Sequence, residues 1–403
     1  IIMITMPEHP HFLPPRQPAC MRSGNTEPSW LRRFPNTSIG IALGLAGHSI
    51  LWECLSRAQF ATHALGEDLL VDLNWFFWCA GLVVFTVVTT VYACKAICHR
   101  DVVLAECRHP VRCHFFNGPH IAMLMLSLGT PTAARDETLL RAVWVVAAVL
   151  QCKLSTIFYA RWLFSKTATL AVARTPYLLS TVGWFLLSAL GSAVNLDDAW
   201  HLPLPSWVFG AGVASYTLVV IGVFMSIASA PTEKGQPALF LLVAPSSVAS
   251  IALVPLNGGV FGPASSAIFG YNLLMVMVLL RLSPQFATKP VLLGTYWAYV
   301  FPLAALAASS VRYATIGRPT GTETAPAEAL AWVLVSVASL TLLSVFLRML
   351  WHEMQVMRGH ERWDDPIARA CDDAQGTSAD VEDGSGPAAV QHEHVAVEAM
   401  ATG

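Results

Sequence analysis

Basic side chains within or at the ends of apolar stretches are the residues of this sequence best suited to chemistry. Lys153 lies inside one apolar stretch, Arg281 ends a second, and Arg312 ends a third. A cation buried in a helix bundle is costly unless it meets a counter-charge or water. Because no Asp or Glu lies in the middle of any apolar stretch, we favour a hydrated path that attracts anions as the partner of Lys153. Snorkelling to the headgroups is the competing interpretation, and it is stronger for Arg281 and Arg312.

Two histidines in apolar stretches could carry protons. Proton-coupled transporters use carboxylates or histidines inside the membrane as relays. Since carboxylates are absent there, His48 and His120 would have to supply such a relay. A single histidine at a helix interface is more often a hydrogen-bonded packing residue, so both interpretations stay open.

Cysteine and histidine residues form a loose cluster around residues 94–114, but their spacing matches no standard zinc pattern. We interpret these cysteines as reduced cytoplasmic thiols. The sequence contains no phosphate-binding loop, nucleophile elbow or HExxH motif. We therefore expect neither an enzyme nor a bound metal or other cofactor. The cluster consists of Cys94, Cys98, His99, Cys107, His109, Cys113 and His114.

The elements that must position these residues are apolar stretches long enough to cross a bilayer. The chain is 55% hydrophobic and 12% charged, and a soluble domain usually carries about twice that charge fraction. A helix needs about 20 apolar residues to span the hydrocarbon, and backbone groups in lipid must be satisfied internally. We predict an all-α membrane protein with ten transmembrane helices. The expected spans are near 36–57, 72–97, 112–130, 138–158, 170–194, 205–228, 237–256, 265–284, 290–311 and 328–351.

The odd-numbered spans differ in composition from the even-numbered ones. Spans 1, 5, 7 and 9 are rich in small and hydroxyl residues such as Gly47, Ser246 and Ala304, whereas even spans carry bulky residues such as Trp75. Small residues let helices approach closely, and proline bends a helix. The pattern predicts five helical hairpins with the odd helices inside, and it leaves open whether these enclose a pore or only pack tightly. The prolines expected to bend the odd helices are Pro35, Pro119, Pro176, Pro245 and Pro302.

The distribution of Lys and Arg predicts the orientation. With an even number of spans, both termini lie on one side, and that side then holds most of the 24 Lys and Arg residues. The positive-inside rule therefore predicts cytoplasmic termini. We expect a disordered cytoplasmic tail over 1–34, a ten-helix transmembrane domain over 35–352, and an acidic disordered cytoplasmic tail over 353–403. The predicted outer side holds Arg57, Arg135, Arg141, Arg312 and Arg318.

Four segments carry a resemblance to a known family. They are RFPNTSIGIALGLAGHSILW (33–52), ECRHPVRCHFFNGP (106–119), LFLLVAPSSVASIA (239–252) and YWAYVFPLAALAASSVRYA (296–314). These segments resemble the tellurite-resistance/dicarboxylate transporter family, and in particular its plant branch, the slow-type anion channels of guard cells. The resemblance covers residues 33–351 and is most specific in the last segment.

The resemblance implies five helical hairpins around a pseudo-fivefold pore, assembled as a homotrimer with one pore per subunit. In that family a phenylalanine at the kink of the ninth helix closes the pore. It matches Phe301, which directly precedes Pro302. The three basic residues match positions that make the family's pathway electropositive. The full set of candidate pathway residues is Lys153, Arg281, Arg312, His48 and Ser246.

The sequence also departs from the family pattern. His48 stands where the plant channels have glutamine, and Gln151 stands where glutamate is usual. The N-terminal tail is shorter than the phosphorylated tail of the plant channels, which puts control by a regulatory kinase in doubt.

We predict a passive channel for chloride and nitrate in the plasma membrane, with small inorganic anions and the lipid bilayer as partners and no nucleic acid. A wide, weakly binding positive pore passes anions without coupling chemistry. One alternative is a proton-coupled transporter of malate or a related dicarboxylate, or of sulfite, with His48 or His120 as the relay. A second alternative is a non-conducting scaffold or sensor that kept the fold.

Overall fold

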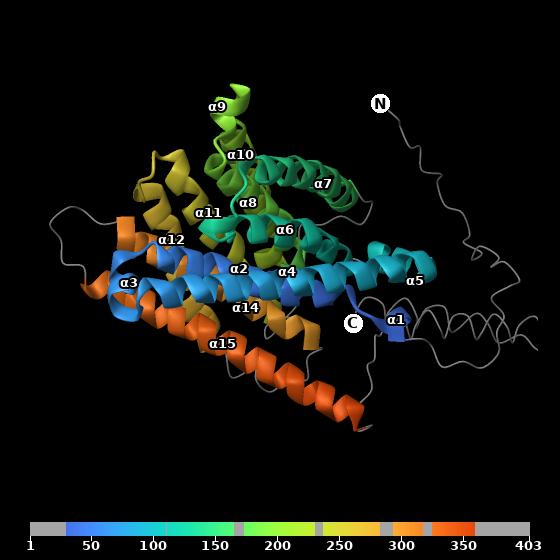
Figure 1. Ribbon diagram of the computed structural model, residues 1–403. Coiled ribbons are helices and arrows are strands. Elements are labelled where there is room, and N and C mark those ends of the chain that lie inside the picture. Colours follow the sequence, from blue (N-terminus) through green and yellow to red (C-terminus); the bar gives the residue numbers. More distant parts are fainter. Residues whose placement is uncertain are drawn as a thin grey trace, which may run out of the picture.

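The computed structural model describes residues 30–109, 111–164, 173–229, 237–282, 293–316 and 325–358, and these ranges are almost entirely helical (Figure 1). Most of the two expected tails, and with them the expected disorder and any kinase site, lie outside the described residues.

Each expected span contains a helix. Eight helical segments of the described residues are long and apolar enough to cross a membrane. The other two expected spans hold α6, which is short, and α14. The all-α membrane class is thus confirmed, and the count of ten membrane-crossing helices stays a prediction. The ten helices are α2 (Ile39–Ser56), α4 (Glu67–Cys98), α6 (Gly118–Leu128), α7 (Glu137–Leu163), α8 (Leu179–Ala193), α10 (Leu204–Ser229), α11 (Ala244–Leu256), α12 (Pro263–Arg281), α14 (Leu293–Ile316) and α15 (Ala325–Met357).

Short helices fill the connections and helix starts. Four are α-helical: α1 (Trp30–Arg33), α3 (Gln59–Leu65), α5 (Arg100–Arg108) and α9 (Leu196–Trp200). Five are 3-10 helices: η2 (Asn36–Ser38), η3 (Arg112–Asn117), η4 (Thr132–Ala134), η6 (Thr175–Leu178) and η8 (Pro237–Leu242). In Figure 1, α1 and α5 lie at one end of the bundle and α3 lies at the other.

The helices alternate between buried and exposed along the chain. Over an 18-residue apolar stretch, 72%, 83% and 78% of the residues are buried in Asn36–Ser56, Thr175–Ala193 and Ala238–Leu256, against 11% in α4. Most residues of α6 and of the described part of α14 are buried as well. The predicted arrangement of odd helices inside and even helices outside is confirmed for the described residues.

The five buried helices contact one another in a closed order. Helix α2 packs on α6, α6 on α8, α8 on α11, α11 on α14, and α14 returns to α2. Each buried helix also packs on the outer helix that follows it, so that α4, α7, α10, α12 and α15 surround the ring. Figure 1 shows α4 and α15 flanking the buried pair α2 and α14. This is the contact order that five hairpins around a common centre would have.

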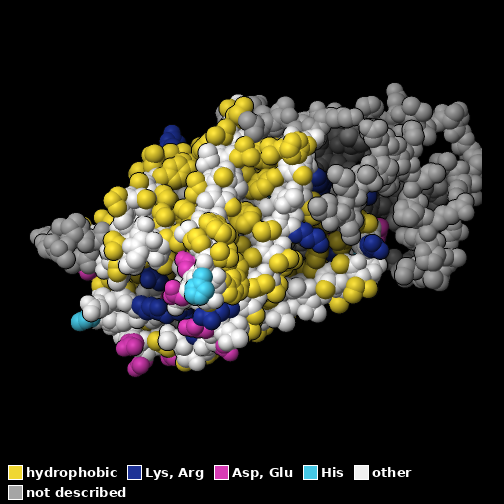
Figure 2. All heavy atoms as spheres, turned by 90° about the horizontal axis from the view of Figure 1, so that it is seen from above, with side chains coloured by type: hydrophobic (Ala, Val, Ile, Leu, Met, Phe, Trp, Pro, Cys, Tyr) yellow, Lys and Arg dark blue, Asp and Glu magenta, His cyan; other side chains and the backbone are white. Residues whose placement is uncertain are grey.

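The outer helices present an apolar surface to their surroundings. Exposed side chains include Phe76 on α4, Val149 on α7, Met277 on α12 and Leu340 on α15. Figure 2 shows hydrophobic side chains spread over the middle of one face, while charged side chains gather toward its ends. Such a surface suits lipid rather than water.

Three of the prolines that were predicted to bend the odd helices lie instead at helix starts. Pro119, Pro176 and Pro245 lie in the first turn of α6, η6 and α11. A first-turn proline breaks no helical hydrogen bond, so these three prolines begin helices and do not kink them. Four of the buried helices, α2, α6, α8 and α11, follow a 3-10 segment, and the segment before α2 is preceded by Pro35. The prolines inside helices are Pro255 in α11 and Pro302 in α14, as far as the described residues go.

Helices α2 and α14 approach each other closely at Gly44. A Cβ on Gly44 would lie 2.8 Å from Cε3 of Trp297 and 3.0 Å from Cγ1 of Val300. Glycine here lets two backbones approach in the way that small residues do in membrane bundles.

Gly44→Ala should therefore destabilise the protein, because the new methyl group must displace a buried indole ring at a cost of about 1–3 kcal/mol. Thermal unfolding of the purified protein in detergent measures the change. Gly270→Ala on α12 is the matched control, since Gly270 is exposed and a Cβ there meets nothing within 4 Å. An equal or smaller loss of stability for Gly44→Ala than for Gly270→Ala would contradict the close packing of α2 and α14.

Candidate functional site

Phe301 on α14 points toward the inside of the ring. Its side chain is buried, with 3% exposed. The position that a Cβ would take on Gly47 of α2 lies 3.4 Å from Cδ2 of Phe301 and 3.4 Å from Cε of Met125 on α6. Helices α6 and α14 are not consecutive in the ring order. Gly47 therefore faces both of these helices, and the Phe301 ring that approaches it lies on the inner side of α2.

Local sequence explains why Phe301 could move. Pro302 has no N–H, so α14 lacks one backbone hydrogen bond at this turn and is easier to bend there. The residues that follow are mostly alanines, and Ala304, Ala307 and Ala308 are fully or almost fully buried. These small side chains fill little volume around the phenyl ring.

Arg312 lies on the same face of α14 as Phe301. Eleven residues make slightly more than three full turns of an α-helix and advance about 16 Å. Between the two residues, this face carries Ala305 and Ala308. Arg312 interacts with the thiol of Cys54 and with the charge of Glu53, both near the C-terminal end of α2. A cation thus lies at one end of the helix face that holds Phe301.

The other predicted pathway residues lie elsewhere. Lys153 is exposed on α7, whereas Gln151 and Ser155 form the buried face of that helix. Gln151 and Ser155 each lie two residues from Lys153, and two residues correspond to a rotation of about 200° around an α-helix. Lys153 therefore lies on the opposite side of α7 and points away from the ring. Arg281 is exposed in the last turn of α12. The expectation that these two cations line the inside of the ring is therefore corrected for this chain.

His48 and Ser246 face outer helices. Nδ1 of His48 lies 3.0 Å from the Gly44 carbonyl, and its ring centroid lies 5.4 Å from that of Phe77 on α4. The hydroxyl of Ser246 donates to Oδ1 of Asn272 on α12 at 2.5 Å. Of the five predicted pathway residues, Arg312 is the one that the described structure brings onto the face of Phe301.

His120 belongs to a polar chain that links three helices. Its Nε2 lies 2.6 Å from Oε1 of Gln151 on α7. Nε2 of Gln151 donates to the Ser180 carbonyl of α8 at 2.6 Å and to the Ser155 hydroxyl at 3.0 Å. This buried chain ties α6, α7 and α8 together, as expected of a hydrogen-bonded packing histidine.

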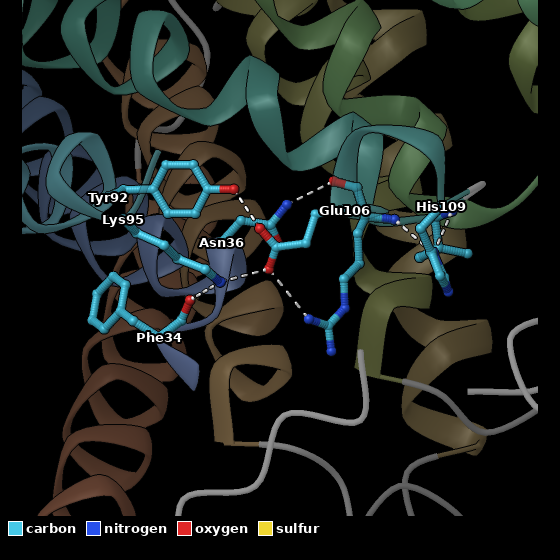
Figure 3. Close-up of polar contacts among 8 residues, drawn as sticks. Phe34, Asn36, Tyr92, Lys95, Glu106 and His109 are labelled. Atoms are coloured by element: carbon cyan, nitrogen blue, oxygen red, sulfur yellow. Dashed lines mark hydrogen bonds and ion pairs between the residues drawn. The ribbon is translucent and has the colours of Figure 1, made fainter. Parts of the chain in front are cut away.

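A buried ionic cluster lies at the end of the bundle that carries α1 and α5, and Figure 3 shows its contacts. Oε1 of Glu106 lies 3.2 Å from Nζ of Lys95 and 3.5 Å from Nη1 of Arg112, and its Oε2 accepts from the Tyr92 hydroxyl. Lys95 also donates to the Phe34 carbonyl at 2.7 Å. The side chains of Lys95 and Glu106 are fully buried, so the cluster holds the segment before α2 against α4, α5 and η3.

Sequence reasoning missed this cluster. Lys95 is one of the Lys and Arg residues that predict the orientation, and Glu106 lies in the ECRHPVRCHFFNGP segment, but neither pattern pairs them. The break between α4 and α5 at His99 turns the chain back, so that residues eleven apart meet. The spacing of apolar residues in the sequence does not predict this change of direction.

A small cavity of about 60 Å³ adjoins the cluster. Its wall is formed by α4, η3 and the starts of α2 and α6, including Val88, Phe115 and Phe116. The Asn36 amide oxygen and the Thr89 hydroxyl are in this wall and have no partner among the described residues.

Comparison with known proteins gives one family. The family model described as voltage-dependent anion channel, SLAC1, matches residues 33–350. The chain is 28% identical over 331 residues to the S-type anion channel SLAH3 of Arabidopsis thaliana, covering 80% of this chain and 49% of that protein. It is 28% identical over 295 residues to the guard cell S-type anion channel SLAC1 of the same plant, covering 72% and 51%. The chain thus spans about half the length of these plant relatives.

A bacterial relative is more distant. The tellurite resistance protein TehA homolog of Haemophilus influenzae is 25% identical over 287 residues, which cover 70% of this chain and 81% of that protein.

The ionic cluster predicts a large effect for Glu106→Gln. Removing the carboxylate leaves the buried ammonium of Lys95 without its counter-charge, which should cost about 3–5 kcal/mol of folding free energy. Glu137→Gln is the control, because Glu137 pairs with Arg141 at 3.1 Å on the exposed surface and should lose less than about 1 kcal/mol. Thermal unfolding measures both. The double change Lys95→Met with Glu106→Gln should recover part of the loss, and no recovery would contradict the pairing.

Proposed function

The chain belongs to the SLAC1 family of voltage-dependent anion channels, and from this premise we propose that it is a passive channel for chloride and nitrate, gated by Phe301. The family consists of channels and transporters and not of enzymes. The observation that carries the proposal is the direction of Phe301 toward the inside of a closed ring of five buried helices.

The gate works by excluding water. A bulky apolar side chain in a narrow passage keeps ions out, because an ion cannot give up its hydration shell to a phenyl ring. The missing backbone hydrogen bond at Pro302 lets this turn of α14 bend, and the alanines beyond it leave room for the ring. When Phe301 swings aside, the small-residue faces of the ring line the opened path.

Charge selects the permeating ion. Arg312 puts a positive charge on the face of α14 that holds Phe301, and a cation at a low-dielectric passage attracts anions over a longer range than in water. The middle of each span lacks carboxylates, so little in the path repels an anion. Weak binding at few sites lets anions leave as readily as they enter.

Topology and assembly complete the proposal. The chain crosses the plasma membrane ten times with both termini in the cytoplasm, in line with its distribution of Lys and Arg. It forms a homotrimer of five-hairpin subunits, each with its own pseudo-fivefold pore. Contact between copies would cover the exposed cation Lys153, which is costly to leave in lipid. A regulatory kinase, if one acts, targets the N-terminal tail outside the described residues.

Voltage-clamp recording of the wild type and of Phe301→Ala tests the function. Removing the ring should raise anion current at least about tenfold, since the main obstacle to ion passage is gone. The reversal potential should follow the external chloride or nitrate concentration by about 59 mV per tenfold change. Phe269→Ala is the control, because Phe269 is a buried phenylalanine of the outer helix α12.

Three other outcomes would contradict the proposal. A reversal potential that shifts with external pH would support a proton-coupled transporter of a dicarboxylate or of sulfite. Absence of current in both the wild type and Phe301→Ala at matched surface expression would support a non-conducting scaffold. An equal gain of current in Phe269→Ala would show that loosened packing, and not a gate, opens the path.

Arg312 and Lys153 should differ in their effect on conduction. Arg312→Gln removes the cation on the face of Phe301 and should lower anion conductance several-fold, by about 3–10-fold. Lys153→Gln changes an exposed residue of an outer helix and should leave single-channel conductance unchanged. Single-channel recording in the Phe301→Ala background measures both, and equal losses would contradict the assignment of the path.

A further inference from the structure

Three arginines surround one carboxylate at the end of the bundle where α2 and α14 finish. Oε1 of Glu53 lies 2.5 Å from Nη2 of Arg57, the residue that caps the C-terminus of α2. The same oxygen lies 3.5 Å from Nη2 of Arg135 in the connection between α6 and α7. Arg312 of α14 interacts with the same carboxylate charge and with the neighbouring thiol of Cys54. The cluster thus joins three separate parts of the chain.

The cluster has more positive than negative charge. Arg57 and Arg135 pair with one buried carboxylate, whose side chain is 5% exposed, and the charge of Arg312 interacts with it as well. Arg135 also donates to the Leu128 carbonyl at 3.4 Å. Even so, the Nε atoms of Arg135 and Arg312 are buried without a hydrogen-bond partner among the described residues. Figure 2 shows charged side chains of both signs lying together toward one end of the molecule.

The electrostatics of Arg135 point in the same direction. Arg135 lies between η4 and α7, outside the spanning helices. Burial lowers its pKa, the charges of Arg57 and Arg312 lower it further, and Glu53 opposes both. One carboxylate therefore does not fully compensate the positive charges around it, and an additional anion would.

We propose that Arg57, Arg135 and Arg312 form an external binding site for a small inorganic anion, and that the Glu53 carboxylate competes with that anion for the site. Guanidinium groups bind carboxylate, nitrate and halide through the same charge-assisted N–H donors. The site therefore serves a dissolved anion when the carboxylate turns aside. The unpartnered Nε atoms are donors that the tethered carboxylate does not use.

The position of the site connects it to conduction and rests on the proposed channel function. Arg312 belongs both to this cluster and to the face of α14 that carries Phe301. An anion held here is thus at the outer entrance of the path. A built-in competitor keeps the affinity low, and a channel needs low affinity so that ions leave quickly.

The test uses the purified chain of 403 residues and a readout that does not need conduction. Thermal unfolding is measured while chloride replaces gluconate at constant ionic strength. Glu53→Gln removes the competitor, so chloride should stabilise this variant at a concentration about tenfold lower than it stabilises the wild type. Glu137→Gln is the matched control, since it removes a carboxylate paired with a single exposed arginine, and it should behave like the wild type.

Identical chloride dependence in Glu53→Gln and wild type would overturn the proposal. If Glu53→Gln does not fold, Arg57→Gln decides, because Arg57 is the most exposed member, with 45% of its side chain accessible. This variant should need at least about threefold more chloride for the same stabilisation, and no change would likewise overturn the site.

Current recordings separate this inference from the channel itself. Phe301→Ala is recorded with and without Glu53→Gln, and the external chloride concentration that gives half-maximal current is compared. If both variants conduct and this concentration is the same, the site is refuted and the channel remains intact. Glu53-dependent stabilisation by chloride without any current would refute the channel function and retain the anion-binding site.

Discussion

The contact between α2 and α14 is the constraint on which the rest of the structure depends. These two helices close the ring of buried helices, and they approach closely because Gly44 lies directly against Trp297 and Val300. The same approach brings Gly47 next to Phe301 and Ala304. A side chain at Gly44 would push α2 and α14 apart, and the position of Phe301 relative to α2 would change with them.

Charge is confined to the two ends of this ring. At one end Glu106 is buried with Lys95 and Arg112, and at the other Glu53 is buried with three arginines. Between them the inward contacts described around Phe301 are apolar or small. Such a distribution lets ionic groups hold the helix ends in place while the centre stays uncharged, which suits a gate that works by excluding water.

Composition was enough to predict the alternation of buried and exposed helices, because four of the five odd spans are rich in small residues. The third span, which holds the buried helix α6, is an exception, since most of its side chains are large. The faces of individual helices were not predictable in this way. Lys153 and Gln151 lie two residues apart on α7, yet one is exposed and the other buried. Partners such as Glu53 and Arg135 are 82 residues apart, so their meeting depends on the packing of whole helices. The prediction that Pro119, Pro176 and Pro245 bend helices was wrong, because a proline in the sequence is equally compatible with a kink and with the first turn of a helix.

The 3-10 turns before the buried helices change how far those helices reach. A 3-10 helix rises about 2.0 Å per residue, against about 1.5 Å for an α-helix. The six residues of η3 and the eleven of α6 together extend about 28 Å, close to the thickness of the hydrocarbon core of a bilayer, about 30 Å. A 3-10 segment before a short α-helix thus adds more length per residue than another α-helical turn would. The chain can then cross a membrane with fewer residues, and fewer side chains fill the centre of the bundle.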